Sequence, residues 1–78
     1  MIQGDRIEIN PNVMLGKPVI RGTRIPVALI LRKLSEGATE AELLDGYPRL
    51  TPEDIRAALA YAADSVSHEE TLALTSRD

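Results

Sequence analysis

Apolar residues recur along the chain at two spacings, and the change between them separates the elements that we expect. Residues 6–9 alternate polar and apolar side chains, which predicts a short strand. The turn-forming run Asn10-Pro11-Asn12 ends that strand. From residue 27 onward, apolar residues recur every three or four positions, as in helices that pack one face on a core. The pattern therefore predicts a mainly helical chain behind a small β element.

The first two helices are defined by residues that begin and end helices. Apolar spacing predicts the first helix over residues 26–36, and Gly37 is its expected end. Thr39 and Glu42 have the spacing of a capping box, in which each side chain bonds the backbone N–H of the other residue. They predict a short second helix whose core-facing residues are Leu43, Leu44 and Tyr47.

The third helix has the clearest start in the chain. Thr51 suits the N-cap and Pro52 suits the first helical position. A polar tail over residues 67–78 follows this helix. We thus expect a mainly α fold, in which residues 1–66 form a trihelical, helix-turn-helix-like (homeodomain-like) domain with a short N-terminal β element. The residues of the third helix expected to face the core are Ile55, Ala58, Leu59, Ala62 and Val66.

Composition narrows the class of protein. A chain of 78 residues allows one domain with a small core, so we expect a homodimer or a larger assembly. The absence of cysteine excludes disulfides and thiolate metal sites and points to the reducing cytoplasm. No apolar run approaches the roughly 20 residues of a membrane span. Residues 1–9 also lack the apolar stretch of a signal peptide, so we expect a cytoplasmic protein without membrane contact.

The run at residues 16–27, GKPVIRGTRIPV, predicts a stiff basic hairpin. Val19-Ile20 and Arg24-Ile25 are predicted as tiny strands, joined by a turn in which Gly22 supplies a positive φ. Residues 1–35 carry six cations against two acids, a net charge of +4, while residues 36–78 carry three against ten, a net charge of −7. Such segregation suggests two surfaces for two kinds of partner. The residues that we expect to contact phosphates of double-stranded DNA are Lys17, Arg21, Arg24, Arg32 and Lys33.

Two interpretations of this basic segment stay open from the residues alone. Its arginines contact phosphates, or they pair with Glu8 or an acid of the second helix and only hold the hairpin in place. Reading of DNA bases by the third helix is disfavoured, because Glu53 and Asp54 repel phosphates at its start and residues 57–63 carry no charge.

The uncharged stretch of the third helix indicates instead a contact with another subunit or partner. We expect that contact at Ala57, Ala60 and Tyr61. In the polar tail, Leu72 and Leu74 are two apolar anchors that we expect to dock on a partner protein.

No set of catalytic or metal-binding residues is visible. His68 is the single histidine and has too few partners for a metal site. The serines have no convincing base and orienting group around them, and Gly16 and Gly22 do not fit a phosphate-binding loop. We expect neither enzyme activity nor a cofactor or metal ion.

Four motifs resemble those of a known family. They are GKPVIRGTRIPV at residues 16–27, LSEG at residues 34–37, Tyr47-Pro48, and TPEDI at residues 51–55 leading into AALAYA. Over about residues 5 to 66, the chain resembles the small prokaryotic domain-of-unknown-function family numbered 433. The resemblance implies a helix-turn-helix-like antitoxin of a type II toxin–antitoxin pair, similar to VapB-like antitoxins and encoded beside a PIN-like nuclease toxin. It also implies repression of the shared operon, with DNA contacts at Lys17, Arg21 and Arg24.

Two functional hypotheses follow. The first is an antitoxin-like regulator that binds a PIN-like toxin and operator DNA. The second is a protein-interaction or dimerisation module without DNA binding, whose basic segment docks on an acidic protein. The composition of the third helix favours the second hypothesis, while the basic N-terminal half allows the first.

Overall fold

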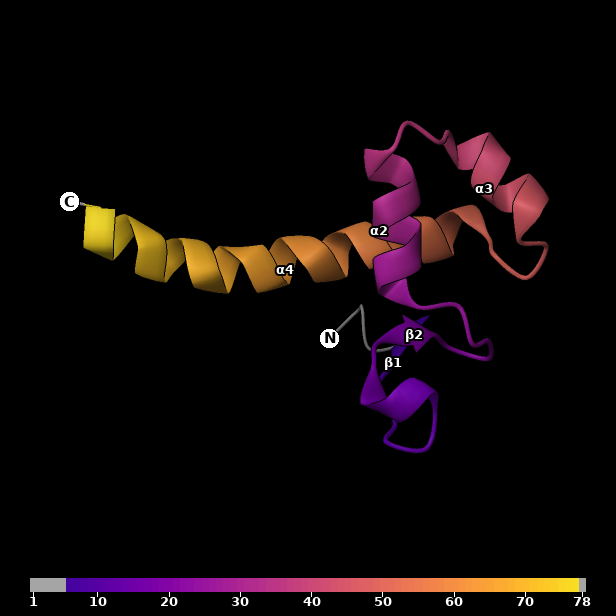
Figure 1. Ribbon diagram of the computed structural model, residues 1–78, viewed down its shortest axis with the longest axis horizontal. Helices are drawn as coiled ribbons and strands as arrows, with labels where there is room; N and C mark the ends of the chain where they lie inside the picture. Colours follow the sequence, from indigo (N-terminus) through magenta and orange to yellow (C-terminus); the bar gives the residue numbers. More distant parts are fainter. Residues whose placement is uncertain (1–5, 78) are drawn as a thin grey trace.

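Over residues 6–77 the chain forms three α-helices and a two-stranded sheet, and Figure 1 shows how they are arranged. The computed structural model describes the backbone of residues 6–77 and the side chains of residues 6–67. In chain order, the elements are β1 (Ile7–Glu8), the 3-10 turn η1 (Met14–Gly16), β2 (Val19–Ile20), α2 (Val27–Ser35), α3 (Glu40–Gly46) and α4 (Pro52–Arg77). The prediction of a mainly helical fold with a small N-terminal β element is confirmed.

The sheet differs from the predicted hairpin in the strands that pair. β2 pairs antiparallel with β1, with Ile20 opposite Ile7. On its other side, β2 makes an isolated bridge between Val19 and Pro26, and residues 24–25 do not form the predicted strand. Pro26 explains this difference, because it has no N–H with which to continue a ladder. The sheet therefore joins the start of the described chain to the hairpin.

The predicted starts of the three helices and the predicted end of the first helix are confirmed. Gly37, just after α2, has φ +101°, a conformation that favours glycine. At α3, the Thr39 hydroxyl accepts from the Glu42 N–H (3.1 Å) and the Glu42 carboxylate accepts from the Thr39 N–H (2.8 Å). α4 begins with Pro52, as predicted. Local sequence thus determines where the three helices begin.

The core lies where α2, α3, α4 and the sheet meet. The helical stripe of α4 is only half buried, because Ile55 and Ala58 are buried whereas Leu59 and Val66 are 46% and 56% exposed. Neither Leu59 nor Val66 therefore faces the core as predicted, and Val66 instead lines an open hollow between α4 and α2. The buried core cluster consists of Ile7, Ile20, Val27, Ile30, Leu43, Leu50, Ile55 and Ala58.

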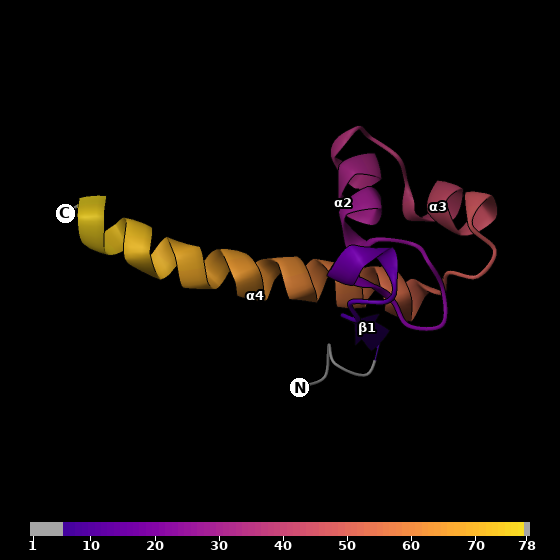
Figure 2. The same ribbon diagram turned by 60° about the horizontal axis from the view of Figure 1, so that its bottom comes forward.

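α4 is longer than predicted, because the helix continues to Arg77 through the segment expected to be a polar tail. Residues 53–77 contain neither proline nor glycine, which explains why nothing ends the helix earlier. Figures 1 and 2 show the C-terminal half of α4 extending away from α2, α3 and the sheet. Across the part of the chain that the structure describes, no helix has the length and apolarity needed to cross a bilayer.

Candidate functional site

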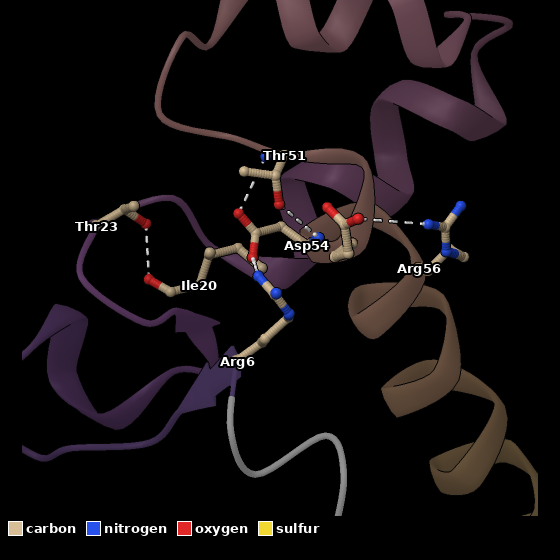
Figure 3. Close-up of polar contacts among 7 residues, drawn as sticks. Arg6, Ile20, Thr23, Thr51, Asp54 and Arg56 are labelled. Atoms are coloured by element: carbon tan, nitrogen blue, oxygen red, sulfur yellow. Dashed lines mark hydrogen bonds and ion pairs between the residues drawn. The ribbon is translucent and has the colours of Figure 1, made fainter.

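The hairpin at residues 18–27 is fixed by its own hydrogen bonds. The Thr23 N–H donates to the Ile20 carbonyl (3.0 Å) and closes a tight turn whose third residue, Gly22, has φ +81°. The Thr23 hydroxyl donates to the same carbonyl (2.7 Å), as Figure 3 shows, and accepts from the Ile25 N–H (2.9 Å). The Ile20 N–H in turn donates to the Ile25 carbonyl (2.9 Å). The exposed residues of this turn are therefore presented on a rigid frame.

Arg49 adds a contact to the hairpin that the sequence does not reveal. It lies between α3 and α4, and its guanidinium donates to the Gly22 carbonyl (2.6 Å), 27 positions away in the chain. Arg24 and Arg49 both line an open hollow of about 590 Å³. Arg49 thus both holds the turn and places a second guanidinium in the hollow. The hollow is lined by Val13, Gly22, Thr23, Arg24, Ile25 and Arg49.

The structure divides the predicted DNA-contacting cations into two groups. Lys17, Arg21 and Arg24 are exposed on the hairpin and the segment before it. Arg32 and Lys33 lie in the last turn of α2, where cations offset the helix dipole. Figure 1 shows that this end of α2 lies far from the hairpin, and Lys33 lines a different hollow, of about 360 Å³, between α2 and α3. We define the basic hairpin surface as Lys17, Arg21, Arg24 and Arg49.

Three consecutive residues before the hairpin have a left-handed backbone. The φ angle is +51° at Met14, +58° at Leu15 and +83° at Gly16. This conformation costs roughly 1–2 kcal/mol for a residue with a side chain. The Leu15 side chain is 92% exposed, so packing within the chain does little to offset that cost. Strain combined with an exposed apolar side chain points to a contact with another molecule.

The start of α4 is occupied by an ion pair that ties it to the N-terminal strand. Figure 3 shows Asp54, which is only 6% exposed, accepting from the Arg6 guanidinium (3.0 Å). The same carboxylate accepts from the Thr51 N–H (3.1 Å), and the Thr51 hydroxyl accepts from the Asp54 N–H (3.2 Å). Also at the start of α4, Arg56 pairs with Glu53 (3.8 Å). An acidic first turn that is bonded within the chain is poorly suited to reading DNA bases.

The predicted interface residues of α4 divide between core and surface. Ala57 and Tyr61 are partly buried and pack against the core of their own chain, whereas Ala60 is exposed. The side chains of Leu72 and Leu74 lie outside the described residues. As far as the structure describes the chain, no three His, Cys, Asp or Glu residues are grouped as a metal ion requires.

Known proteins are similar to this chain over the part that contains the basic hairpin surface. Residues 7–62 match the family model described as Protein of unknown function (DUF433). A crystal structure of a DUF433 member protein from Anabaena variabilis is similar, with a TM-score of 0.77 and 37% identity, covering 90% of this chain and 69% of that one. The uncharacterized protein y4eO of Sinorhizobium fredii is 38% identical over 53 residues, which is 68% of this chain. The chain spans only 24% of the length of that curated relative.

Proposed function

The chain belongs to the DUF433 family, and on that premise we propose that it is a cytoplasmic, antitoxin-like regulator that binds a PIN-like nuclease toxin. The observation that supports this most directly is the basic hairpin surface with the exposed Leu15 beside it. Nucleases that use metal ions hold them with carboxylates, so their active sites are acidic clefts. A cationic surface with one projecting apolar side chain complements such a cleft.

The rigidity of the hairpin also suits this function. Binding is weakened when loops and side chains must be ordered on association, and a frame already fixed by hydrogen bonds avoids part of that cost. The bonds of Thr23 and Arg49 provide that frame. Opposite charges on the two proteins would also accelerate their encounter. In this role the protein resembles VapB-like antitoxins.

Operator DNA is a second candidate partner, favoured by the exposure of Lys17 and Arg24 on the same surface. Lysine and arginine side chains that neutralise phosphates supply most of the affinity in non-specific DNA binding. In this version of the proposal, α3 and α4 form a helix-turn-helix scaffold, and the hairpin rather than α4 contacts the duplex. The alternative function is a protein-interaction module that does not bind DNA.

Binding to the nuclease encoded by the neighbouring reading frame tests the proposal. We expect Arg24→Glu and Leu15→Glu each to raise the Kd of the complex tenfold or more, about 1.4 kcal/mol, measured by isothermal titration calorimetry. Arg56→Glu is the matched control for Arg24→Glu, because it makes the same charge change at an exposed site on α4. A neighbouring nuclease that does not bind, or one bound equally well by all three variants, would contradict the proposal.

DNA binding is separated from toxin binding by its salt dependence. If the hairpin contacts phosphates, Arg21→Ala and Arg24→Ala should each reduce the slope of log K against log salt by about one unit. Electrophoretic or anisotropy assays with the upstream operon DNA measure this slope. A chain that binds the toxin and shows no affinity for that DNA would fit the protein-interaction module instead.

A further inference from the structure

The open hollow beside the hairpin turn brings together three segments that are far apart in the chain. Val13 comes from the loop before η1, residues 22–25 come from the hairpin turn, and Arg49 comes from the loop between α3 and α4. The volume of about 590 Å³ is within the range of pockets that hold small ligands. The hollow is a concave part of the basic hairpin surface, so its lining indicates what a partner can place there.

The lining of the hollow carries positive charge. Of its described residues, two are arginines and none is an acid. Within residues 6–67, neither Arg24 nor Arg49 forms an ion pair with a carboxylate, so Arg24 does not make the pairing with Glu8 or an acid of α3 that the sequence left open. Two cations that share a hollow repel each other, and an anion bound between them removes that repulsion. The hollow therefore favours an anionic group.

Both arginines extend from a fixed backbone and keep donors for a ligand. Arg49 uses one N–H for the Gly22 carbonyl (2.6 Å), and a guanidinium has five N–H donors in all. Arg24 follows Thr23, whose hydroxyl holds the turn through two hydrogen bonds. A carboxylate accepts two parallel N–H bonds from one guanidinium, and such charged bonds are about twice as strong as neutral ones. The available donors thus match a carboxylate.

The apolar part of the lining favours a peptide over nucleic acid. Val13 and Ile25 are half-buried and add carbon surface beside the two arginines. The outside of a DNA duplex presents phosphates and sugars, which have no apolar group to place on this surface. A peptide can place an apolar side chain next to its carboxylate. By excluding water, that side chain would also lower the local dielectric constant and strengthen the ion pair.

We propose that the hollow binds an acidic peptide segment of the partner protein, with one Asp or Glu carboxylate between Arg24 and Arg49. An apolar side chain of the same segment packs against Val13 and Ile25. The identity of the partner as a nuclease toxin rests on the proposed function. Leu15 projects and complements a cleft, whereas the hollow accepts a group that projects from the partner. The acid therefore belongs to the rim of the nuclease cleft and not to its metal-binding centre.

Titration of the full-length, isotopically labelled chain with a short acidic peptide tests this inference without the nuclease. The probe is acetyl-leucyl-glutamyl-leucinamide, and the measurement is the NMR shift of the backbone N–H groups of residues 22–25. We expect saturable shifts at these residues. Acetyl-leucyl-glutaminyl-leucinamide should bind about tenfold more weakly or worse, because it loses the charged hydrogen bonds. Acetyl-alanyl-glutamyl-alaninamide should also bind more weakly, because it loses the apolar contact.

Arg24→Gln should raise the Kd of the acidic leucyl peptide about tenfold. The fold should tolerate this change, because the Arg24 side chain makes no hydrogen bond or ion pair within residues 6–67. Arg56→Gln is the matched control, at an exposed arginine outside the hollow, and should leave the Kd unchanged. Equal affinity for the three peptides, or equal effects of the two variants, would overturn the inference. So would tighter binding of inorganic phosphate than of the acidic leucyl peptide, which would assign the hollow to phosphate groups such as those of operator DNA.

A carboxylate built into the hollow gives a second test that needs no ligand. Val13→Glu places a carboxylate beside the two guanidinium groups, so its Tm should exceed that of Val13→Gln by about 2–4 °C. The same pair of changes at Asn12, which is exposed and does not line the hollow, is the control and should show no such difference. A Tm of Val13→Glu equal to or below that of Val13→Gln would contradict the inference.

Failure of this inference can be distinguished from failure of the proposed function. A nuclease that binds the chain with a Kd unaffected by Val13→Glu would overturn the assignment of the hollow and leave the proposed function standing. A chain that binds the acidic leucyl peptide but not the nuclease would contradict the proposed function and support the hollow as a site for an acidic segment of another protein.

Discussion

α4 begins in a densely bonded part of the molecule and ends outside it. At its first turn, Asp54 is buried and bonded to both Arg6 and Thr51. The C-terminal half of the helix extends away from the other elements (Figure 1). The N-terminal half repeats this contrast on a smaller scale, because the turn at Gly22 is held by Arg49 while Leu15, just before the hairpin, is strained and 92% exposed.

The contrast separates residues that stabilise the chain from residues that are available to a partner. A bonded, buried group such as Asp54 lowers the free energy of the folded state, and its loss should reduce stability without altering the binding surface. A strained, exposed group such as Leu15 raises that free energy. Its replacement should therefore leave the chain as stable as before or more stable, while weakening a contact outside the chain. Three substitutions test this division, and they follow in decreasing order of expected effect.

Asp54→Ala should have the largest effect on stability. The change removes the ion pair with Arg6 and the bond from the Thr51 N–H, so the free energy of unfolding should fall by about 2–3 kcal/mol. Urea denaturation followed by circular dichroism measures this change. An unchanged m-value would show that unfolding exposes the same amount of surface in the variant as in the unsubstituted chain. Glu53→Ala, at the exposed neighbouring position, should change stability by less than about 0.5 kcal/mol. Equal losses for the two variants would show that the ion pair does not anchor the helix.

Leu15→Gly should have a smaller effect of the opposite sign. Glycine adopts the φ of +58° without a steric penalty, and little packing is lost because the side chain is exposed. After the extra entropy of glycine in the unfolded chain is subtracted, we expect a gain of about 0.5–1 kcal/mol. Leu59→Gly, in the middle of a helix, should instead lose about 1 kcal/mol or more. A loss of stability in Leu15→Gly would mean that the left-handed turn is not strained.

Features set by neighbouring residues could be predicted from the sequence. The capping box of Thr39 and Glu42 and the helix end at Gly37 depend on contacts within four residues, and the structure confirms both. The pairing of Arg6 with Asp54 spans 48 positions and could not be predicted, because many acids are available to one arginine in sequence.

The candidate surface was predictable only in part for the same reason. Lys17, Arg21 and Arg24 lie together because they are neighbours in the chain. Arg49 joins them from the loop between α3 and α4, through a hydrogen bond to a residue 27 positions away in the chain, which no local pattern reveals. The true end of α4 was missed because a polar composition was interpreted as a tail, although polar residues such as Glu and Thr do not end a helix as Gly and Pro do.

Arg56→Ala should have the smallest effect, on both stability and binding. Arg56 lies in the anchored part of α4, but its ion pair with Glu53 is long at 3.8 Å and both side chains are more than half exposed, at 69% and 55%. Exposed pairs at this spacing contribute about 0.3–0.5 kcal/mol at most. Because Arg56 is the sole cation of α4 between Pro52 and Ser76, its removal also tests whether that helix contacts DNA. We expect unchanged DNA affinity in an anisotropy assay, whereas Arg24→Ala weakens binding. If Arg56→Ala abolished binding and Arg24→Ala did not, α4 would be the DNA-contacting element, and the anchored region would serve both stability and function.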